Sequence, residues 1–234
     1  MCSAEAVFSW RTGVMRIRTF LLVGILASGP YCLPMSSSAQ ESGERLTKQA
    51  LEECHLGRLA TDRETRLAHF QQGQILGERA VAADEGNADT HFALFCNLGE
   101  LLRIDGESFT SLFGLRRMMN ELDRALEINP AHIDALSAKG TLLVKLPSLL
   151  GGDAEKGEAL LEHVVSRAPK AVNARLSLAK VRCEHGRHQE AVALATDALA
   201  LAQKHNRPDF IPEARAVLKQ LQANADKASS KAQF

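Results

Sequence analysis

The chain has 234 residues with 28 basic and 28 acidic side chains, so its formal net charge is zero. This length suits one ordinary domain, and the balanced charge excludes the strongly basic surface of nucleic-acid-binding proteins. Alanine and leucine dominate the composition and β-branched residues are few, which favours an all-α fold.

The first segment, residues 1–39, has the three-part order of a secretory signal peptide. A basic stretch, Met15–Arg18, precedes an apolar run from Thr19 to Ser28, and small residues follow up to a cut after Ala39. Met15 is an alternative start of translation. The apolar run of about 10 residues is too short for a bilayer, which takes roughly 20. A buried or interfacial anchor helix is the alternative interpretation.

Export places the mature chain outside the cytoplasm, in the periplasm of a bacterial host. Cys32 lies before the cut, but the bulky Tyr31 beside it fits a lipidation site badly, so no lipid anchor is expected. Cys54, Cys96 and Cys183 remain after cleavage. Each lies among apolar helical residues, which predicts small buried side chains, with one structural disulfide as the alternative.

Self-similarity is the strongest signal in the chain. A small residue recurs within an apolar helix at Gly99, Gly140 and Ala179, and each is followed by a second helix that ends near a proline. A small residue lets the paired helix approach closely, and large residues one turn away fill the sides. In the last unit these flanking positions are Arg175 and Arg182, which predicts a terminal repeat with a wetter face.

This pattern resembles the tetratricopeptide repeat. The matching residues are Phe95, Leu98, Gly99, Leu102, Ala125 and Pro130 in one unit, and Gly140, Leu143, Leu161 and Pro169 in the next. The resemblance implies an all-α, helical-hairpin (tetratricopeptide-like) repeat solenoid in residues 40–224, with about four helix pairs and a C-terminal capping helix. We expect the first pair at 44–60 and 64–84, the cap at Pro212–Ala223, and a flexible tail at 225–234.

Residues 146–153 read LPSLLGGD and raise the question of a phosphate loop. Such a loop continues with Lys and a hydroxyl residue, whereas here Asp153 follows the glycines. Asp153 is expected to cap the next helix, while Gly151 and Gly152 permit positive φ for the reversal. We interpret the segment as an enlarged corner that begins at Pro147. Two leucines, Leu149 and Leu150, are available there to line a site.

A Leu-Pro-x-x-Leu-Gly-Gly-Asp corner within imperfect helical repeats, behind a signal peptide, resembles two protein groups over roughly residues 45–222. One is the T-component family of periplasmic proteins associated with TRAP transporters. It implies an oligomeric protein that partners a transporter's solute-binding subunit and can hold an apolar ligand. The other is the regulator of microtubule dynamics family, which implies tubulin binding in a eukaryotic host.

Repeat stacks usually bind through the surface built by the first helix of each pair. In this chain the predicted residues of that surface form a mixed polar and apolar set. They are Cys96, Glu100, Arg103, Ser137, Thr141, Val144, Asn173, Leu176 and Lys180. The set lacks the repeated Lys/Asn/Arg pattern with which some tetratricopeptide domains clamp a peptide carboxylate.

Catalytic and metal patterns are weak. Cys183, His185 and His188 are metal-ligand types, but they span a helix end and a glycine turn, so no metal is expected. No serine elbow, carboxylate pair or nucleotide loop stands out, so we expect neither an enzyme nor a cofactor. The sequence predicts an exported protein-interaction scaffold, accessory to a periplasmic solute transporter. The alternatives are a carrier of an apolar small molecule near the enlarged corners and a tubulin-binding relative.

Overall fold

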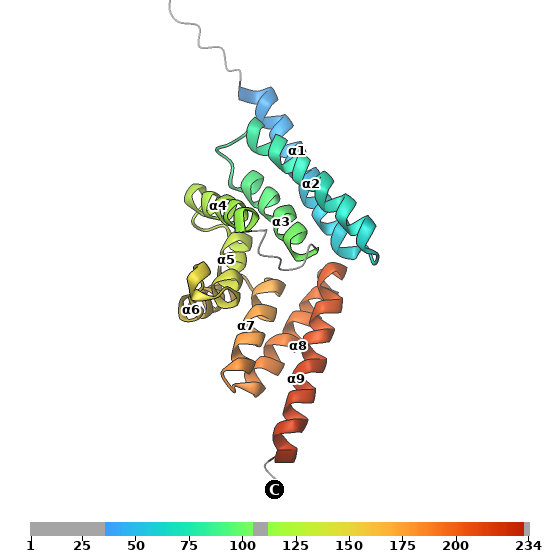
Figure 1. The fold of residues 1–234 in the computed structure, drawn as a ribbon, viewed down its shortest axis with the longest axis vertical. Coiled ribbons are helices and arrows are strands. Elements are labelled where there is room, and N and C mark those ends of the chain that lie inside the picture. Colours follow the sequence, from blue (N-terminus) through green and yellow to red (C-terminus); the bar gives the residue numbers. More distant parts are fainter. Residues whose placement is uncertain (1–35, 105–111, 232–234) are drawn as a thin grey trace, which may run out of the picture. The chain divides into compact units, whose positions relative to one another are not determined.

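The described chain is built from helices. The computed structural model describes residues 36–104 and 112–231, and within these ranges it contains no strand. The helices are α1 (Ser36–Leu59), α2 (Arg63–Ala83), α3 (Ala88–Ile104), α4 (Leu112–Ile128), α5 (Ile133–Lys145), α6 (Ala154–Arg167), α7 (Val172–Glu184), α8 (His188–Lys204) and α9 (Ile211–Lys231), with short 3-10 helices η2 (Ser148–Leu150) and η3 (Pro208–Phe210) (Figure 1). The predicted signal peptide lies outside the described residues, except for Ser36–Ala39, which begin α1.

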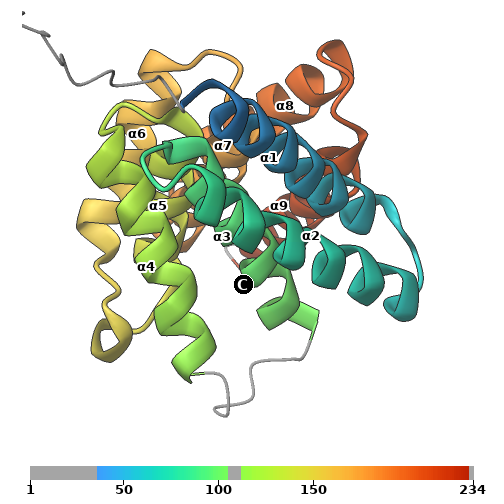
Figure 2. The same ribbon diagram turned by 90° about the horizontal axis from the view of Figure 1, so that it is seen from above.

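Consecutive helices pack as hairpins, and each hairpin packs on the next. The pairs are α1–α2, α3–α4, α5–α6 and α7–α8, joined through α2–α3, α4–α5 and α6–α7 contacts, and α9 packs on α8. Seen from above, α2, α4, α6 and α8 lie towards the outside, while α3 and α9 lie nearer the middle (Figure 2). This is the predicted helical-hairpin repeat solenoid with a C-terminal capping helix.

Local sequence signals set several helix ends. The Asp62 side chain accepts a hydrogen bond from the Thr65 amide at the start of α2, and Asp153 does the same for Lys156 at the start of α6. These carboxylates satisfy amides that have no partner within the helix. Pro130 and Pro169 follow the ends of α4 and α6, where a residue without an N–H cannot continue the helical bonds.

The core of the last repeat depends on alanine. Four alanines of α8, Ala191, Ala195, Ala198 and Ala202, are fully buried against α7 and α9. Their small side chains let these helices approach, and larger residues such as Leu176 and Val217 fill the remaining space. The small-residue pattern of the sequence therefore corresponds to close helix packing.

The structure corrects one expectation about the C-terminal part. The last repeat has no wetter face at Arg175 and Arg182, because both side chains are buried. Arg175 donates to the Ala171 carbonyl oxygen at 2.9 Å, and Arg182 forms ion pairs with carboxylates of α6. The flexible tail at 225–234 stays a prediction, and α9 continues to Lys231. No glycine or proline interrupts the helix there.

Candidate functional site

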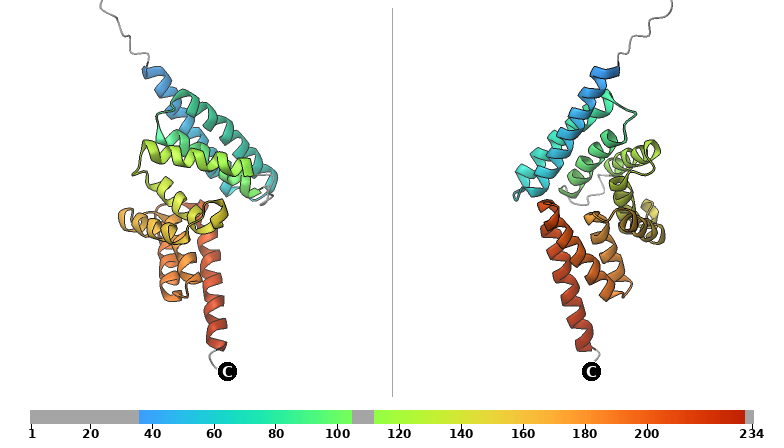
Figure 3. Two further views of the ribbon diagram at one scale, coloured as in Figure 1. Left: turned by 60° about the vertical axis from the view of Figure 1, so that its left-hand side comes forward. Right: turned by 180° about the vertical axis from the view of Figure 1, so that it is seen from behind.

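The first helix of each pair, together with α9, carries a set of charged residues that we call the inner face. It consists of Arg58 on α1, Glu100 and Arg103 on α3, Lys145 on α5, Lys180 on α7 and Glu213 on α9. Contacts between α1 and α3, α5 and α7, and α7 and α9 bring these helices together (Figure 3). The inner face therefore draws on every repeat.

Glu100 is the anionic centre of the N-terminal half of the inner face. Its side chain is 3% exposed, and its Oε1 accepts a hydrogen bond from Arg58 Nε at 2.8 Å and from Arg103 Nη1 at 3.1 Å. Burial lowers the pKa of Arg58, but its interactions with Cys54, Glu100 and Cys96 outweigh burial, and the pKa is raised overall. Glu100 is thus fully used as a partner of two guanidinium groups, and α1 is tied to α3.

Lys145 is the cation of the inner face for which the described residues provide no ion-pair partner. Partial burial lowers its pKa, and the positive charges of Lys180 and Arg103 lower it further. Lys180 is itself neutralised, because its Nζ lies 2.7 Å from Glu213 Oε1. Among the described residues Lys145 forms no such ion pair. The inner face therefore has more positive than negative charge, and the charges of Lys180 and Arg103 act on Lys145.

Neutral hydrogen bonds join α5 and α7 beside this charge. Thr141 Oγ1 lies 2.7 Å from Ser177 Oγ, and Asn173 Nδ2 donates to Ser137 Oγ at 3.2 Å. These bonds fix the two helices relative to each other. Because Ser137 and Ser177 are buried, the bonds also consume most of the polar capacity of this row.

The segment before the capping helix closes on the first repeat. The Asp209 carboxylate of η3 is 1% exposed, 3.0 Å from Arg207 Nη2 and 3.8 Å from His55 Nδ1 of α1. The Phe210 ring lies under two guanidinium groups, with Arg207 at 4.6 Å and Arg58 at 5.9 Å from its centroid. The start of α9 is next to the end of α1 in the right-hand view of Figure 3, and contacts between α1 and η3 join the two ends of the repeat stack.

The structure separates the predicted inner-surface residues into two groups. Glu100, Arg103, Thr141, Asn173 and Lys180 are connected through the contacts described above. Leu176 is fully buried in the core that α7 forms with α8 and α9, Ser137 is buried, and Val144 packs towards α6. Cys96 is half-buried.

Sequence reasoning missed Arg58, Lys145 and Glu213. Lys145 lies four residues after Thr141 on the same helix, so the spacing that selected Thr141 also selects it. Arg58 and Glu213 belong to the first and last elements, where the repeat pattern is weakest. Their role became visible only through contacts with α3 and α7.

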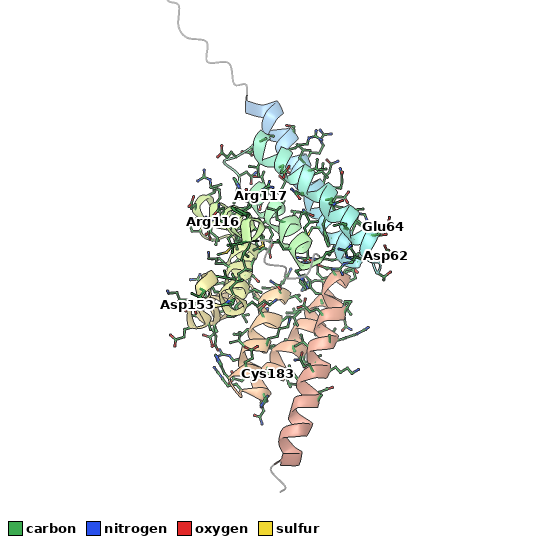
Figure 4. All side chains as sticks on the ribbon, in the orientation of Figure 1. Asp62, Glu64, Arg116, Arg117, Asp153 and Cys183 are labelled. Atoms are coloured by element: carbon green, nitrogen blue, oxygen red, sulfur yellow. The ribbon has the colours of Figure 1, made fainter. Side chains whose placement is uncertain are left out.

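The enlarged corner is a capped turn. Gly151 has φ +87° and Asp153 caps α6, as predicted, while the Asp153 amide donates to the Leu143 carbonyl at 2.9 Å. Gly152 does not have the predicted positive φ, and a glycine is needed there for a steric reason. A Cβ atom there would lie 1.7 Å from the Leu146 carbonyl oxygen. Leu149 is 98% exposed, so it encloses no cavity, and Leu150 is half-buried. Figure 4 shows Asp153 where this corner meets α6.

The Cys183–His188 segment does not assemble a metal site. Cys183 Sγ lies 3.6 Å from His188 Nδ1, whereas the exposed His185 turns to Glu158 at 3.2 Å. In the part of the chain that the structure describes, no group of three or more metal-ligand side chains converges. Likewise, none of the described helices is long and apolar enough to cross a membrane.

Comparisons with known proteins give likenesses of fold. No family model and no curated protein matches the chain. It is similar to TTC0263, a thermophilic TPR protein in Thermus thermophilus, with a TM-score of 0.49 and 19% identity, covering 75% of this chain and 98% of that chain. It is also similar to MamA 41-end from Desulfovibrio magneticus RS-1, with a TM-score of 0.45 and 13% identity. This likeness covers 82% of the present chain and 98% of that chain.

A third solved structure, YrrB, is described as a TPR protein with an unusual peptide-binding site. It has a TM-score of 0.33 and 13% identity, covering 82% of this chain and 99% of that chain. Scores and identities this low carry no argument about what the present chain binds. Its tetratricopeptide-like fold rests on the helix order and contacts described above.

Proposed function

We propose that this tetratricopeptide-like chain is a protein-interaction scaffold whose inner face binds an acidic segment of a partner protein. The observation that carries the proposal is the charge of Lys145, which forms no ion pair among the described residues and feels the like charges of Lys180 and Arg103. An exposed surplus of positive charge attracts carboxylates and selects against basic partners.

An extended protein segment fits this arrangement better than a small anion. The three cations come from successive inner helices, and packed helices are about 8–10 Å apart. A single phosphate or carboxylate cannot contact all three, whereas a short extended peptide with spaced acidic residues can, since each residue spans about 3.3 Å. The half-buried Thr141 and Asn173 lie in the same row, and their hydrogen bonds with Ser177 and Ser137 join α5 and α7 beside these charges.

The finer form of the proposal concerns location and partner. The order of basic, apolar and small residues in 1–39 supports export, with a periplasmic location in a bacterial host. The Leu-Pro-x-x-Leu-Gly-Gly-Asp corner supports a role as accessory to a solute transporter, with its solute-binding subunit as partner. Neither feature calls for catalysis, and we propose no enzyme activity.

The first test uses a defined ligand. A short labelled peptide rich in Glu and Asp is titrated with the mature chain, and a Lys-rich peptide of equal length serves as the control ligand. We expect Lys145→Glu to weaken binding of the acidic peptide about tenfold or more, because reversing one charge near a bound carboxylate costs upwards of about 1.4 kcal/mol. Lys219→Glu on the exposed side of α9 is the matched protein control. Equal affinity of both variants would contradict the proposed surface.

The second test identifies the partner. The tagged, exported protein is crosslinked in its own host and recovered as wild type, Lys145→Glu or Lys219→Glu, and partners are identified by mass spectrometry. A solute-binding subunit that is lost only with Lys145→Glu would support the transporter-accessory role. A different partner with the same dependence would support the scaffold and reject the transporter. Partners that are unaffected by Lys145→Glu would reject the inner face as the binding surface.

A further inference from the structure

A pocket of about 280 Å³ lies where the link between α6 and α7 meets the C-terminal half of α8. Its lining consists of Pro169, Arg175, Asp197, Ala200, Leu201 and Lys204, none of which belongs to the inner face. The four lining residues of α8 have the spacing of a single helix face. Because ligand pockets usually measure roughly 300–1,000 Å³, this pocket suits a small ligand.

The guanidinium group of Arg175 presents unused donors to the pocket. Its Nη1 donates to the carbonyl oxygens of Ala171 at 2.9 Å and of Ala168 at 3.5 Å. Among the described residues, Nε and Nη2 of Arg175 have no acceptor, and unlike the buried Nε of Arg182 they are not sealed from solvent. Nε and Nη2 form one edge of the guanidinium, and such an edge matches the two oxygens of a carboxylate.

The charged groups of the pocket are not neutralised by one another. Arg175, Asp197 and Lys204 form no ion pair with any described residue. Burial lowers the pKa of Arg175, and the negative charge of Asp197 opposes this effect without a direct contact. A buried cation without a counter-ion is costly for the folded chain, and a bound carboxylate reduces that cost.

We propose that this pocket binds a free α-amino acid with an apolar side chain. Arg175 and Lys204 bind the carboxylate of the ligand, and Asp197 binds its ammonium group. The side chain of the ligand packs on the apolar lining, which consists of Pro169, Ala200 and Leu201. The site lies apart from the inner face, so it goes beyond the proposed binding of an acidic segment.

Other small ligands match this lining less well. A phosphate ester brings two negative charges towards Asp197, and a simple amine meets two cations. A fatty acid or another monocarboxylate satisfies Arg175 but covers Asp197 without giving it a partner, which costs free energy. A zwitterion gives each charged group of the pocket an opposite charge.

The test titrates the purified protein with L-leucine by isothermal calorimetry. Three further probes each remove one recognised group: L-leucinamide lacks the carboxylate, N-acetyl-L-leucine lacks the ammonium group, and glycine lacks the apolar side chain. We expect saturable binding of leucine and at least about tenfold weaker binding of each of the other probes. Absence of leucine binding at millimolar concentration would overturn the proposal. Equal binding of leucine and N-acetyl-leucine would overturn it as well, because a carboxylate alone would then be recognised.

Two exposed residues of α8 allow the roles to be separated without disturbing the core. We expect Asp197→Asn to weaken leucine at least about fivefold while leaving N-acetyl-leucine unchanged, and Lys204→Gln to weaken both by a similar factor. Glu184→Gln and Lys219→Gln, which remove one exposed charge of each sign elsewhere, are the matched controls. Leucine affinities that do not differ between these variants and their controls would place any binding outside the pocket.

The two binding functions can fail independently of each other. Lys145→Glu should bind leucine like wild type, and Lys204→Gln should bind the acidic peptide like wild type, because the two residues belong to different surfaces. Loss of leucine binding in Lys145→Glu would overturn the assignment of leucine to the pocket beside α8.

Discussion

At the scale of single residues, three glycines allow the cost of steric crowding to be measured separately from the cost of backbone strain. Gly152 is crowded by the Leu146 carbonyl and has an ordinary φ, Gly186 has φ +74° with nothing near its missing Cβ, and Gly86 has neither constraint. Comparing the same substitution at the three positions therefore isolates each cause.

We expect Gly152→Ala to lower the free energy of unfolding by about 2–3 kcal/mol, because backbone must move to make room. Gly186→Ala should cost about 1–2 kcal/mol from the left-handed backbone alone. Gly86→Ala should stay within about 0.5 kcal/mol of wild type. Urea unfolding followed by circular dichroism measures all three. A Gly152→Ala protein as stable as Gly86→Ala would contradict the described corner geometry.

Lys145 illustrates a conflict between stability and binding. Its lowered pKa shows that the folded chain disfavours its charge, so this residue works against folding at every pH below the lowered pKa. We expect Lys145→Met to keep the melting temperature or raise it slightly. The gain in the free energy of unfolding should stay below about 0.5 kcal/mol, because water screens the charge of this exposed side chain. The same variant should bind the acidic peptide more weakly. Loss of stability together with binding would instead assign Lys145 a structural role.

At the scale of elements, the α5–α6 crossing tests whether the small-residue pattern has the same meaning in each repeat. A Cβ on Gly140 would lie 2.9 Å from Leu161 Cγ, and Leu161 is fully buried. A Cβ on Gly99 would meet only Met118 Sδ at 3.4 Å. The two positions are equivalent in the repeat pattern but differ in packing.

Gly140→Ala should therefore destabilise the protein by about 1–3 kcal/mol, since the crossing cannot relax without moving a core leucine. Gly99→Ala should be neutral or stabilising by up to about 1 kcal/mol, because alanine is the better helix former. Thermal and urea unfolding of the two variants provide the measurement. Equal destabilisation would mean that the helix spacing in the two hairpins is the same.

The link between α7 and α9 depends on Glu213. Burial raises the pKa of this carboxyl, but its hydrogen bond with Lys180 and the charges of Lys180, Lys145 and Arg103 outweigh that effect and lower it from 4.5. A carboxyl with a lowered folded-state pKa contributes stability above its unfolded pKa and loses it as the pH falls through the folded value. We expect wild type to lose up to about 1 kcal/mol more than Glu213→Gln between about pH 5 and pH 3, measured by urea unfolding at each pH.

At the scale of the whole repeat domain, η3 connects the last repeat to the first. Phe210 contacts the guanidinium groups of Arg58 and Arg207, and Asp209 lies near His55. We expect Phe210→Ala to increase amide hydrogen exchange at the end of α1 and at the start of α9, because both ends lose a shared contact. Exchange in α5 and α6 serves as the internal control. Unchanged exchange at the end of α1 would show that the first repeat is held by α2 and α3 alone.

Most of the element order followed from local signals. Small residues at Gly99, Gly140 and Ala179 placed the hairpins, and prolines after α4 and α6 marked helix ends. Two local predictions failed. Arg182 is buried because carboxylates of α6 neutralise it, and Gly152 is required because the chain reversal brings the Leu146 carbonyl against it. Such contacts leave no periodic pattern in the sequence.

The sequence by itself determined the all-α repeat architecture, because helix spacing and small-residue periodicity are properties of each hairpin alone. It also indicated a polar inner surface through Glu100, Arg103 and Lys180. Only the tertiary structure decided which of these charges remain unpaired, and it added Arg58, Lys145 and Glu213. The physical reason is that neutralisation depends on distances between helices far apart in the chain, which only packing fixes.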